Sequence, residues 1–167
     1  KHGYEKKSLA RDLEKHEREA LLGDEPFAAY HKRIQALYPK ITKASFLSAF
    51  KNAIVHDKAM LEYCRSLKPR YRLYLLSNNY NVVSPVLRKD GLTSLFDGTV
   101  FSNEVHLIKP NRGIFKYLLK KYSLRPKSCL FIDDMKSNVI TAEKAGLKAV
   151  QFKSLSQLKA YLEKYSF

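Results

Sequence analysis

Residues 128–134 read Ser-Cys-Leu-Phe-Ile-Asp-Asp, an uninterrupted apolar run that ends in two adjacent carboxylates. A short run of this kind, without polar alternation, is typical of a strand in a parallel sheet that helices cover on both faces. Asp133 and Asp134 would then lie at the carboxyl end of the strand, where ligands bind in open parallel sheets. The segment therefore predicts an α/β fold and also the edge of the sheet that carries chemistry.

Strands and helices alternate through the part of the chain around this segment. We predict further strands at 71–76, 99–102 and 149–152 and helices at 82–88, 112–122, 136–145 and 155–165. Gly146 follows the third of these helices, at a position where helices commonly end. Regular alternation of apolar strands with helices predicts a parallel sheet of the α/β class.

The first 68 residues carry helical patterns only. We predict four helices, which begin near Ser8, Pro26, Thr42 and Asp57. Gly23 ends the first of them, and the side chains of Thr42 and Asp57 can accept hydrogen bonds from the turns that they precede. We therefore divide the chain into a helical domain at 1–68 and an α/β domain at 69–167.

The charge, the apolar runs and the cysteines each bear on the class of protein and on its compartment. The chain has 31 Lys and Arg against 16 Asp and Glu, a net charge of +15, but the excess is spread evenly, which favours a basic surface over a nucleic-acid-binding arm. Its apolar runs are far shorter than the roughly 18 residues of a membrane span. Cys64 and Cys129 lie far apart without a CxxC motif, which favours a reducing compartment, and we expect a cytoplasmic protein.

Each predicted strand is followed by polar residues. Ser77 and Asn78 end the first, the loop after the second reaches Lys109, and Asp133 and Asp134 end the third. Because the carboxyl ends of parallel strands meet at one edge, we expect these groups to converge. Carboxylate oxygens bind Mg²⁺, whereas Ser, Asn and Lys donors bind phosphoryl oxygens. The set points to a divalent cation and a phosphate.

Simpler structural roles exist for the same residues. Ser77 or Asn78 can cap the next helix, Lys109 and Pro110 can form a turn, and one aspartate can cap the helix that starts near 136. The ordered occurrence at three strand ends favours the functional interpretation. We interpret the histidines at 16, 31 and 106 as surface residues of helices or loops.

Three segments resemble motifs of the haloacid dehalogenase superfamily. Leu-Leu-Ser-Asn at 75–78, Ile-Lys-Pro at 108–110 and Phe-Ile-Asp-Asp-Met-Lys-Ser-Asn at 131–138 are similar to its motifs II, III and IV. The helices before them resemble the helical cap of its subfamily I, the phosphoglycolate phosphatase type. The resemblance implies a Rossmann-like core and Mg²⁺-dependent transfer of a phosphoryl group, through an aspartyl-phosphate, from a small phosphorylated metabolite.

The resemblance also implies roles for individual residues. On the phosphate side, Ser77 would hydrogen-bond the phosphoryl group with the help of Asn78, and Lys109 would neutralise charge on the phosphoryl oxygens and the nucleophile. On the metal side, Asp133 would be a direct Mg²⁺ ligand, and Asp134 would ligate through water or orient the lysine. Asn138, five residues after the first aspartate, would support their loop.

One motif of the family has no counterpart in the 167 residues. Motif I, an Asp-x-Asp after an apolar strand, supplies the nucleophile and the general acid, and no Asp-x-Asp occurs in this chain. We expect a segment upstream of Lys1 to carry it, and we expect residues 1–167 by themselves to be inactive. In the family this strand lies between those of motifs II and IV, so its removal would leave their edges unpaired.

A second hypothesis is a non-catalytic binding or scaffold protein of the same fold. The missing nucleophile and the charge of +15 motivate it, and a salt-sensitive mobility shift with nucleic acid would support it. Dehalogenase chemistry is disfavoured by the adjacent Asp133 and Asp134, which suit a metal-dependent reaction. The sequence specifies neither the substrate nor the choice between monomer and dimer.

Overall fold

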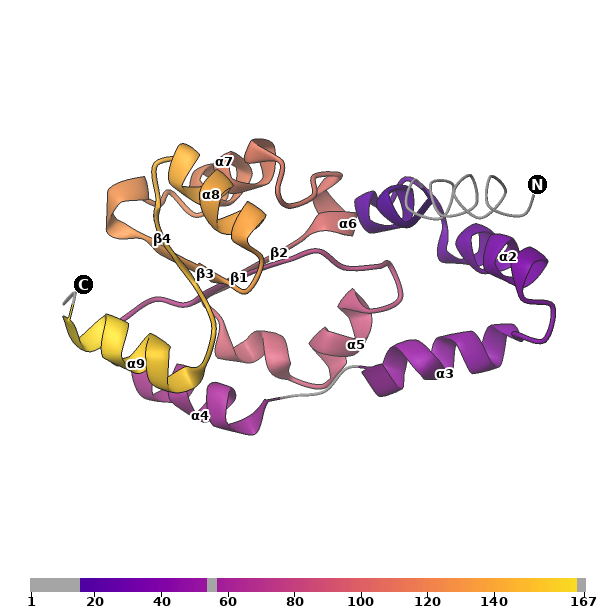
Figure 1. Ribbon diagram of the computed structural model, residues 1–167, viewed down its shortest axis with the longest axis horizontal. Coiled ribbons are helices and arrows are strands. Elements are labelled where there is room, and N and C mark those ends of the chain that lie inside the picture. The colour runs from indigo at the N-terminus through magenta and orange to yellow at the C-terminus, as the bar shows by residue number, and fades with distance from the viewer. Residues whose placement is uncertain (1–15, 54–56, 165–167) are drawn as a thin grey trace, which may run out of the picture. The chain divides into compact units, whose positions relative to one another are not determined.

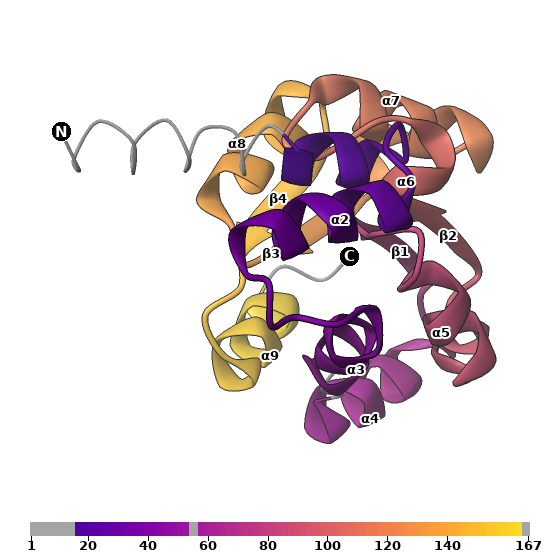
Figure 2. The ribbon, with the colours of Figure 1, turned by 90° about the vertical axis from the view of Figure 1, so that its right-hand side faces the viewer.

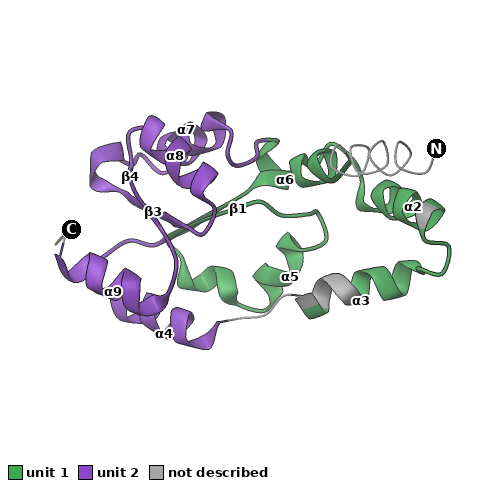
Figure 3. Ribbon diagram, in the orientation of Figure 1, with its two compact units in different colours: residues 1–56, 74–106 green, residues 57–73, 107–167 purple. Residues whose placement is uncertain are grey.

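The computed structural model describes residues 16–53 and 57–164 (Figure 1). The chain divides into two compact units, each built from two separate stretches of sequence (Figure 3). Unit 1 consists of residues 1–56 and 74–106, and unit 2 of residues 57–73 and 107–167. The boundary between a helical cap at 1–68 and a core at 69–167 was inferred from the helical and strand patterns of the sequence and from the family resemblance, and it stays a prediction.

Unit 1 contains one pair of parallel strands. Its elements after the first helices are β1 (Tyr74–Ser77), α5 (Ser84–Lys89), η1 (Leu92–Leu95), β2 (Gly98–Phe101) and α6 (Ser102–Val105). Leu76 lies opposite Val100 and Ser77 opposite Phe101, and the side chains of Val100 and Phe101 are completely buried. The second predicted strand was one residue too long at its end, because Ser102 begins the short helix α6.

The N-terminal helices of unit 1 agree with the sequence pattern where they are described. Residues 16–22 are helical, whereas positions 8–15 of the first predicted helix lie outside the described residues. Helix α2 (Phe27–Leu37) follows Pro26, and α3 (Lys43–Ala53) follows Thr42. The predicted cap of α3 is confirmed, since Thr42 Oγ1 accepts a hydrogen bond of 3.1 Å from the backbone N–H of Ser45.

Aromatic side chains form the core of this helical part. The rings of Phe27 and Phe46 stack at 5.3 Å, and those of Tyr30 and Tyr80 stack at 5.8 Å. Burial, reinforced by the hydrogen bond to Glu17 and its charge, raises the pKa of Tyr80 well above its usual range. This tyrosine therefore stays protonated and stabilises the unit by packing and by donating its hydroxyl proton.

His31 does not lie on the surface, contrary to the expectation from the sequence. Its side chain is 5% exposed, and its ring lies 5.4 Å from that of Phe46. The Nε2 atom is buried without a hydrogen-bond partner among the described residues. The residue belongs to the aromatic core because it lies on the inner face of α2, beside Tyr30. The spacing of polar and apolar residues in the sequence did not reveal this position.

Unit 2 contains the second pair of parallel strands. Its elements are α4 (Lys58–Leu67), α7 (Arg112–Lys121), η2 (Pro126–Ser128), β3 (Leu130–Asp133), α8 (Lys136–Lys144), β4 (Lys148–Gln151) and α9 (Leu155–Lys164). Asp57 caps α4 as predicted, because its carboxylate accepts a hydrogen bond of 3.0 Å from the N–H of Met60. Helix α8 packs against both strands, and Figure 2 shows it beside β4.

The core of unit 2 lies between β3 and α7. Ile114 and Phe115 of α7 are completely buried, and the ring of Phe115 meets that of Phe131 edge to face at 5.1 Å. The neighbour of Phe131 in the strand, Ile132, is 38% exposed. Strand β3 therefore packs its Phe131 side against α7, and this packing holds in place the strand that ends at Asp133.

Both strand pairs are parallel, which confirms the α/β class that the apolar runs predicted. Among the described residues β1 pairs only with β2, and β3 only with β4. The longest complete helices in the described ranges, α2 and α3, have 11 residues each. No described helix is long and apolar enough to cross a bilayer.

Candidate functional site

Lys109 and Asp133 form a buried ion pair in unit 2. The Nζ atom lies 2.7 Å from Oδ2, and the two side chains are 11% and 6% exposed. Asp133 is the last residue of β3, and Lys109 lies in the loop that leads to α7. Two of the residues that the sequence singled out, 24 positions apart, are therefore in direct contact.

The other oxygen of Asp133 is also occupied. Its Oδ1 accepts hydrogen bonds from the backbone N–H of Met135 at 2.9 Å and from Nδ2 of Asn138 at 2.8 Å. Asn138 is buried in the first turns of α8. Because β3 leads into α8 through a short turn, the strand end and the helix start hold the carboxylate in one orientation.

These contacts keep Asp133 ionised. Burial by itself would raise the pKa of this carboxyl group, but the hydrogen bonds from Lys109 and Asn138, the charge of Lys109 and the N–H of Met135 together lower it below its ordinary value. The residue is therefore a carboxylate at neutral pH. The sequence analysis expected Asp133 and Lys109 to converge at the end of this strand, and the structure shows them in contact.

The ion pair makes the stability of the protein dependent on acid pH. Because the folded-state pKa of Asp133 lies below its unfolded value of about 3.9, its stabilisation is present above that pH and is lost as the pH falls through the folded pKa. We expect Asp133→Asn to be about 2–4 kcal/mol less stable at neutral pH, since Lys109 loses its counter-ion. Urea unfolding of both proteins between about pH 7 and about pH 2.5 tests this. A stability difference that stays constant down to the lowest pH contradicts the assignment.

Asp134, the second predicted carboxylate, has a different environment. Its side chain is exposed, and its backbone carbonyl accepts a hydrogen bond of 2.8 Å from Nε2 of Gln151 in β4. Within the part of the chain that the structure describes, the carboxylate forms no hydrogen bond or ion pair. Its oxygens are therefore open to water or to a cation.

Ser77 and Asn78 lie in unit 1, at the carboxyl end of β1. Neither caps the next helix, because α5 begins after Val83. The structure brings Lys109, Asp133 and Asn138 together in unit 2. The approach of Ser77 and Asn78 to those residues stays a prediction.

Two further polar residues lie near β1: Ser102, which the sequence placed at the end of the second predicted strand, and Asn79, to which it assigned no role. Ser102, completely buried, accepts a hydrogen bond of 2.9 Å from the N–H of Asn79 and donates one of 2.6 Å to the carbonyl of Leu21. The Nδ2 atom of Asn79 is buried without a partner among the described residues. The position of Ser102 at a strand end was a signal that the sequence offered, whereas Asn79, the second Asn of a pair, carries no signal that separates it from an ordinary loop residue.

Comparison with known proteins shows the family to which the chain belongs. Residues 3–146 match the model of the haloacid dehalogenase-like hydrolases. The chain belongs to this family. The match confirms the family that the segments around Ser77, Lys109 and Asp133 resembled, and with it the Rossmann-like α/β fold.

Several relatives of this haloacid dehalogenase-like hydrolase are phosphatases. A D-ribitol-5-phosphate phosphatase of Bacteroides thetaiotaomicron is 30% identical over 117 residues, which is 66% of this chain and 55% of that protein. A phosphoglycolate phosphatase of Pasteurella multocida is 35% identical over 68 residues, 41% of this chain and 30% of that protein. The chain thus spans about half the length, or less, of these two relatives.

A solved structure shares the fold. It is a haloacid dehalogenase family enzyme of Bacteroides thetaiotaomicron, in complex with magnesium and inorganic phosphate. It superimposes with a TM-score of 0.75, at 24% identity, over 84% of this chain and 77% of that one. At this level of identity the similarity establishes the fold.

Proposed function

We propose that this chain is part of a Mg²⁺-dependent phosphatase that acts on a small phosphorylated metabolite. The observation that carries the proposal is the ionised, buried Asp133 at the end of β3 in contact with Lys109. Membership of a hydrolase family whose relatives include two sugar- or glycolate-phosphate phosphatases supports it.

Lys109 would bind the phosphoryl group. An ammonium group has three N–H donors, and Asp133 Oδ2 accepts one of them in the structure. The contact to the carboxylate fixes the position of the charge before the substrate arrives, so that it need not reorganise during the reaction. Ser77 and Asn78 would add a hydroxyl and an amide donor to the phosphoryl oxygens, as the resemblance implies.

The residues at the end of β3 fit a magnesium ion. Mg²⁺ prefers oxygen ligands, and the low pKa of Asp133 keeps this carboxylate charged at neutral pH. Each carboxylate oxygen has two lone pairs, so the hydrogen bonds to Asp133 leave acceptor capacity, and Asp134 offers an exposed carboxylate next to it. Asn138 would keep Asp133 in position. The cation would supply charge neutralisation at the phosphate.

The proposal is tested with the complete protein and a panel of small phosphate monoesters. We expect release of phosphate that requires Mg²⁺ and stops with a chelator. Lys109→Met keeps most of the length of the side chain but removes its charge, and we expect the rate to fall by about a hundredfold or more. Lys116→Met is the matched control, because Lys116 is exposed on α7 of the same unit.

Two results would contradict this function. One is phosphate release that persists without a divalent cation or in folded Lys109→Met. The other is an inactive complete protein that binds nucleic acid with a steep dependence on salt, which would support the non-catalytic alternative.

A further inference from the structure

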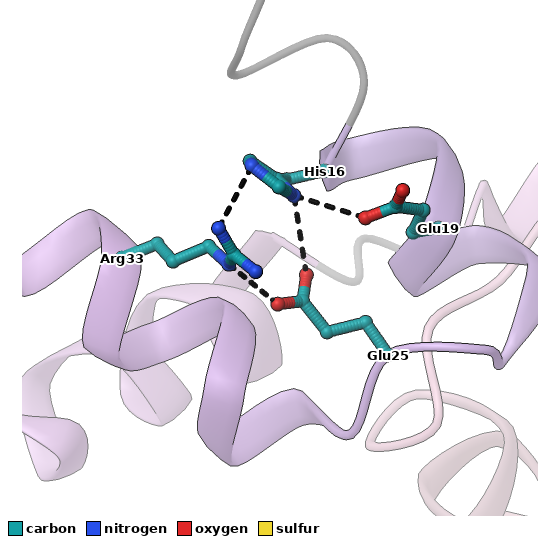
Figure 4. Close-up of polar contacts among 4 residues, drawn as sticks. All are labelled: His16, Glu19, Glu25 and Arg33. Atoms are coloured by element: carbon teal, nitrogen blue, oxygen red, sulfur yellow. Dashed lines mark hydrogen bonds and ion pairs between the residues drawn. The ribbon is translucent and has the colours of Figure 1, made fainter.

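A cluster of four ionisable side chains in unit 1 lies outside the site described above (Figure 4). His16 and Glu19 stand one turn apart on the helix at 16–22, Glu25 lies in the loop before α2, and Arg33 is on α2. One ring nitrogen of the histidine and one oxygen of each glutamate all lie within 4.8 Å of one another.

The contacts within the cluster are short. His16 Nδ1 lies 2.9 Å from Glu19 Oε2 and 4.0 Å from Glu25 Oε2. Arg33 Nε donates to Glu25 Oε1 at 2.7 Å, and Arg33 Nη1 lies 2.9 Å from His16 Nε2. Figure 4 shows the Oε2 atom of Glu25 directed at the imidazole ring.

Hydrogen bonding among these four residues leaves one atom unsatisfied. A guanidinium group only donates, so His16 Nε2 must accept from Arg33, and the ring proton then sits on Nδ1. Nδ1 donates that proton to Glu19, the nearer carboxylate. Glu25 is only 8% exposed, and within the described ranges 16–53 and 57–164 its buried Oε2 atom has no hydrogen-bond partner. A buried carboxylate oxygen without a donor is costly, so a charge network alone does not account for this arrangement.

We propose that His16, Glu19 and Glu25 form a binding site for a divalent cation of the zinc type. A cation among them would satisfy Glu25 Oε2 and bring all three residues into one coordination shell. One imidazole nitrogen with two carboxylate oxygens is a ligand set that Zn²⁺ accepts, with water in the fourth position. The nitrogen ligand disfavours Mg²⁺ and Ca²⁺, which take oxygen.

The site forms with small movements. Two Zn²⁺ ligands at about 2.0–2.1 Å and a tetrahedral angle are about 3.3 Å apart, so the separations of 2.9 Å and 4.0 Å from His16 Nδ1 change by less than about 1 Å. The proton on Nδ1 moves to Nε2, which displaces Arg33 Nη1. The Arg33 side chain is 53% exposed, so its head group can turn toward solvent while Nε keeps its contact with Glu25.

The proton balance and the charge are both favourable. The histidine changes tautomer and the site neither gains nor loses a proton. Two carboxylates and one guanidinium give the four side chains a net charge of −1, which attracts a divalent cation. A bound ion would connect the helix at 16–22, the loop at Glu25 and, through Arg33, helix α2. The site is independent of the proposed phosphatase activity.

The test consists of two titrations of the metal-free complete protein. Binding of Zn²⁺ is measured by calorimetry. Binding of Co²⁺ is measured by visible absorption, which reports low coordination numbers and nitrogen ligands. We expect Glu19→Gln and His16→Gln each to weaken binding to this site by tenfold or more. Glu19 is the more informative variant, because its side chain is 35% exposed and its replacement leaves the Arg33–Glu25 pair intact. Glu143→Gln, an exposed glutamate on α8, is the matched control.

Asp133→Asn separates this site from the candidate magnesium site, because binding here should survive that change. The inference is overturned if folded wild-type protein binds neither Zn²⁺ nor Co²⁺ at micromolar concentration. It is also overturned if Glu19→Gln and His16→Gln, with unchanged circular dichroism, bind both ions as the wild type does.

Discussion

Asp133→Asn is expected to reduce Mg²⁺-dependent phosphate release by the complete protein by a hundred- to a thousandfold, roughly the loss that follows removal of one preorganised charged group. The substitution keeps the shape of the side chain, and an amide oxygen can still accept from Met135 and Asn138. It removes the negative charge that pairs with Lys109 and that would hold the cation. Initial rates measured at saturating Mg²⁺ check the prediction.

The stability of the variant must be separated from its activity, because Asp133→Asn removes the carboxylate that neutralises the nearly buried ammonium group of Lys109. The double variant Lys109→Met, Asp133→Asn removes both charges and should recover part of the lost stability while staying inactive. Asp90→Asn, an exposed aspartate at the end of α5, is the control and should keep full activity. Wild-type turnover in folded Asp133→Asn would refute the role of this carboxylate.

Gly23→Ala is expected to be the most damaging single-methyl change in unit 1, with a loss of about 3–4 kcal/mol in the free energy of unfolding. Gly23 has φ of +77°, in the left-handed region that costs a residue with a Cβ about 1–2 kcal/mol. A Cβ atom at this position would also overlap the backbone carbonyl oxygen of Asn103, at the start of α6. The backbone of one of the two segments must move, which adds the cost of overpacking.

Gly91 is a matched control for this prediction. Its φ is +76°, nearly the same as at Gly23, but a Cβ there would meet no atom within 4 Å. Gly91→Ala should therefore lose only the conformational part, about 1–2 kcal/mol. Urea unfolding of both variants measures the difference, which isolates the contact with Asn103. Equal losses for Gly23→Ala and Gly91→Ala would show that this contact carries no stability.

The helix starts were predictable because their causes lie within a few residues. Thr42 and Asp57 accept hydrogen bonds from residues three positions later, as their side chains and spacing indicated. The strand ends were less accurate, since β1 was predicted at 71–76 and is Tyr74–Ser77. A strand ends where its partner ends, and the partner of Ser77 is Phe101, which lies 24 positions away in sequence.

The candidate site was likewise predictable only in part. Lys109 and Asp133 were identified from their places after predicted strands and from the motifs that they resemble, and Asn138 from the resemblance alone; the structure brings the three together. The direction of the pKa shift was not predictable, because it depends on whether the donors around Asp133 outweigh its burial. The same limit applies to His16, which the sequence assigned to the surface and which the structure places between two glutamates.

The sequence by itself determined the α/β class and the caps of α3 and α4, because periodicity and capping act over a few residues. It also singled out Lys109 and Asp133 as a candidate site, because both are polar residues that follow apolar strands. Only the tertiary structure decided that Asp133 is ionised, that a buried oxygen of Glu25 lacks a hydrogen-bond partner among the residues the structure describes, and that Gly23 has no room for a methyl group. Each of these depends on atoms that distant segments bring within a few ångströms, and no local pattern encodes such distances.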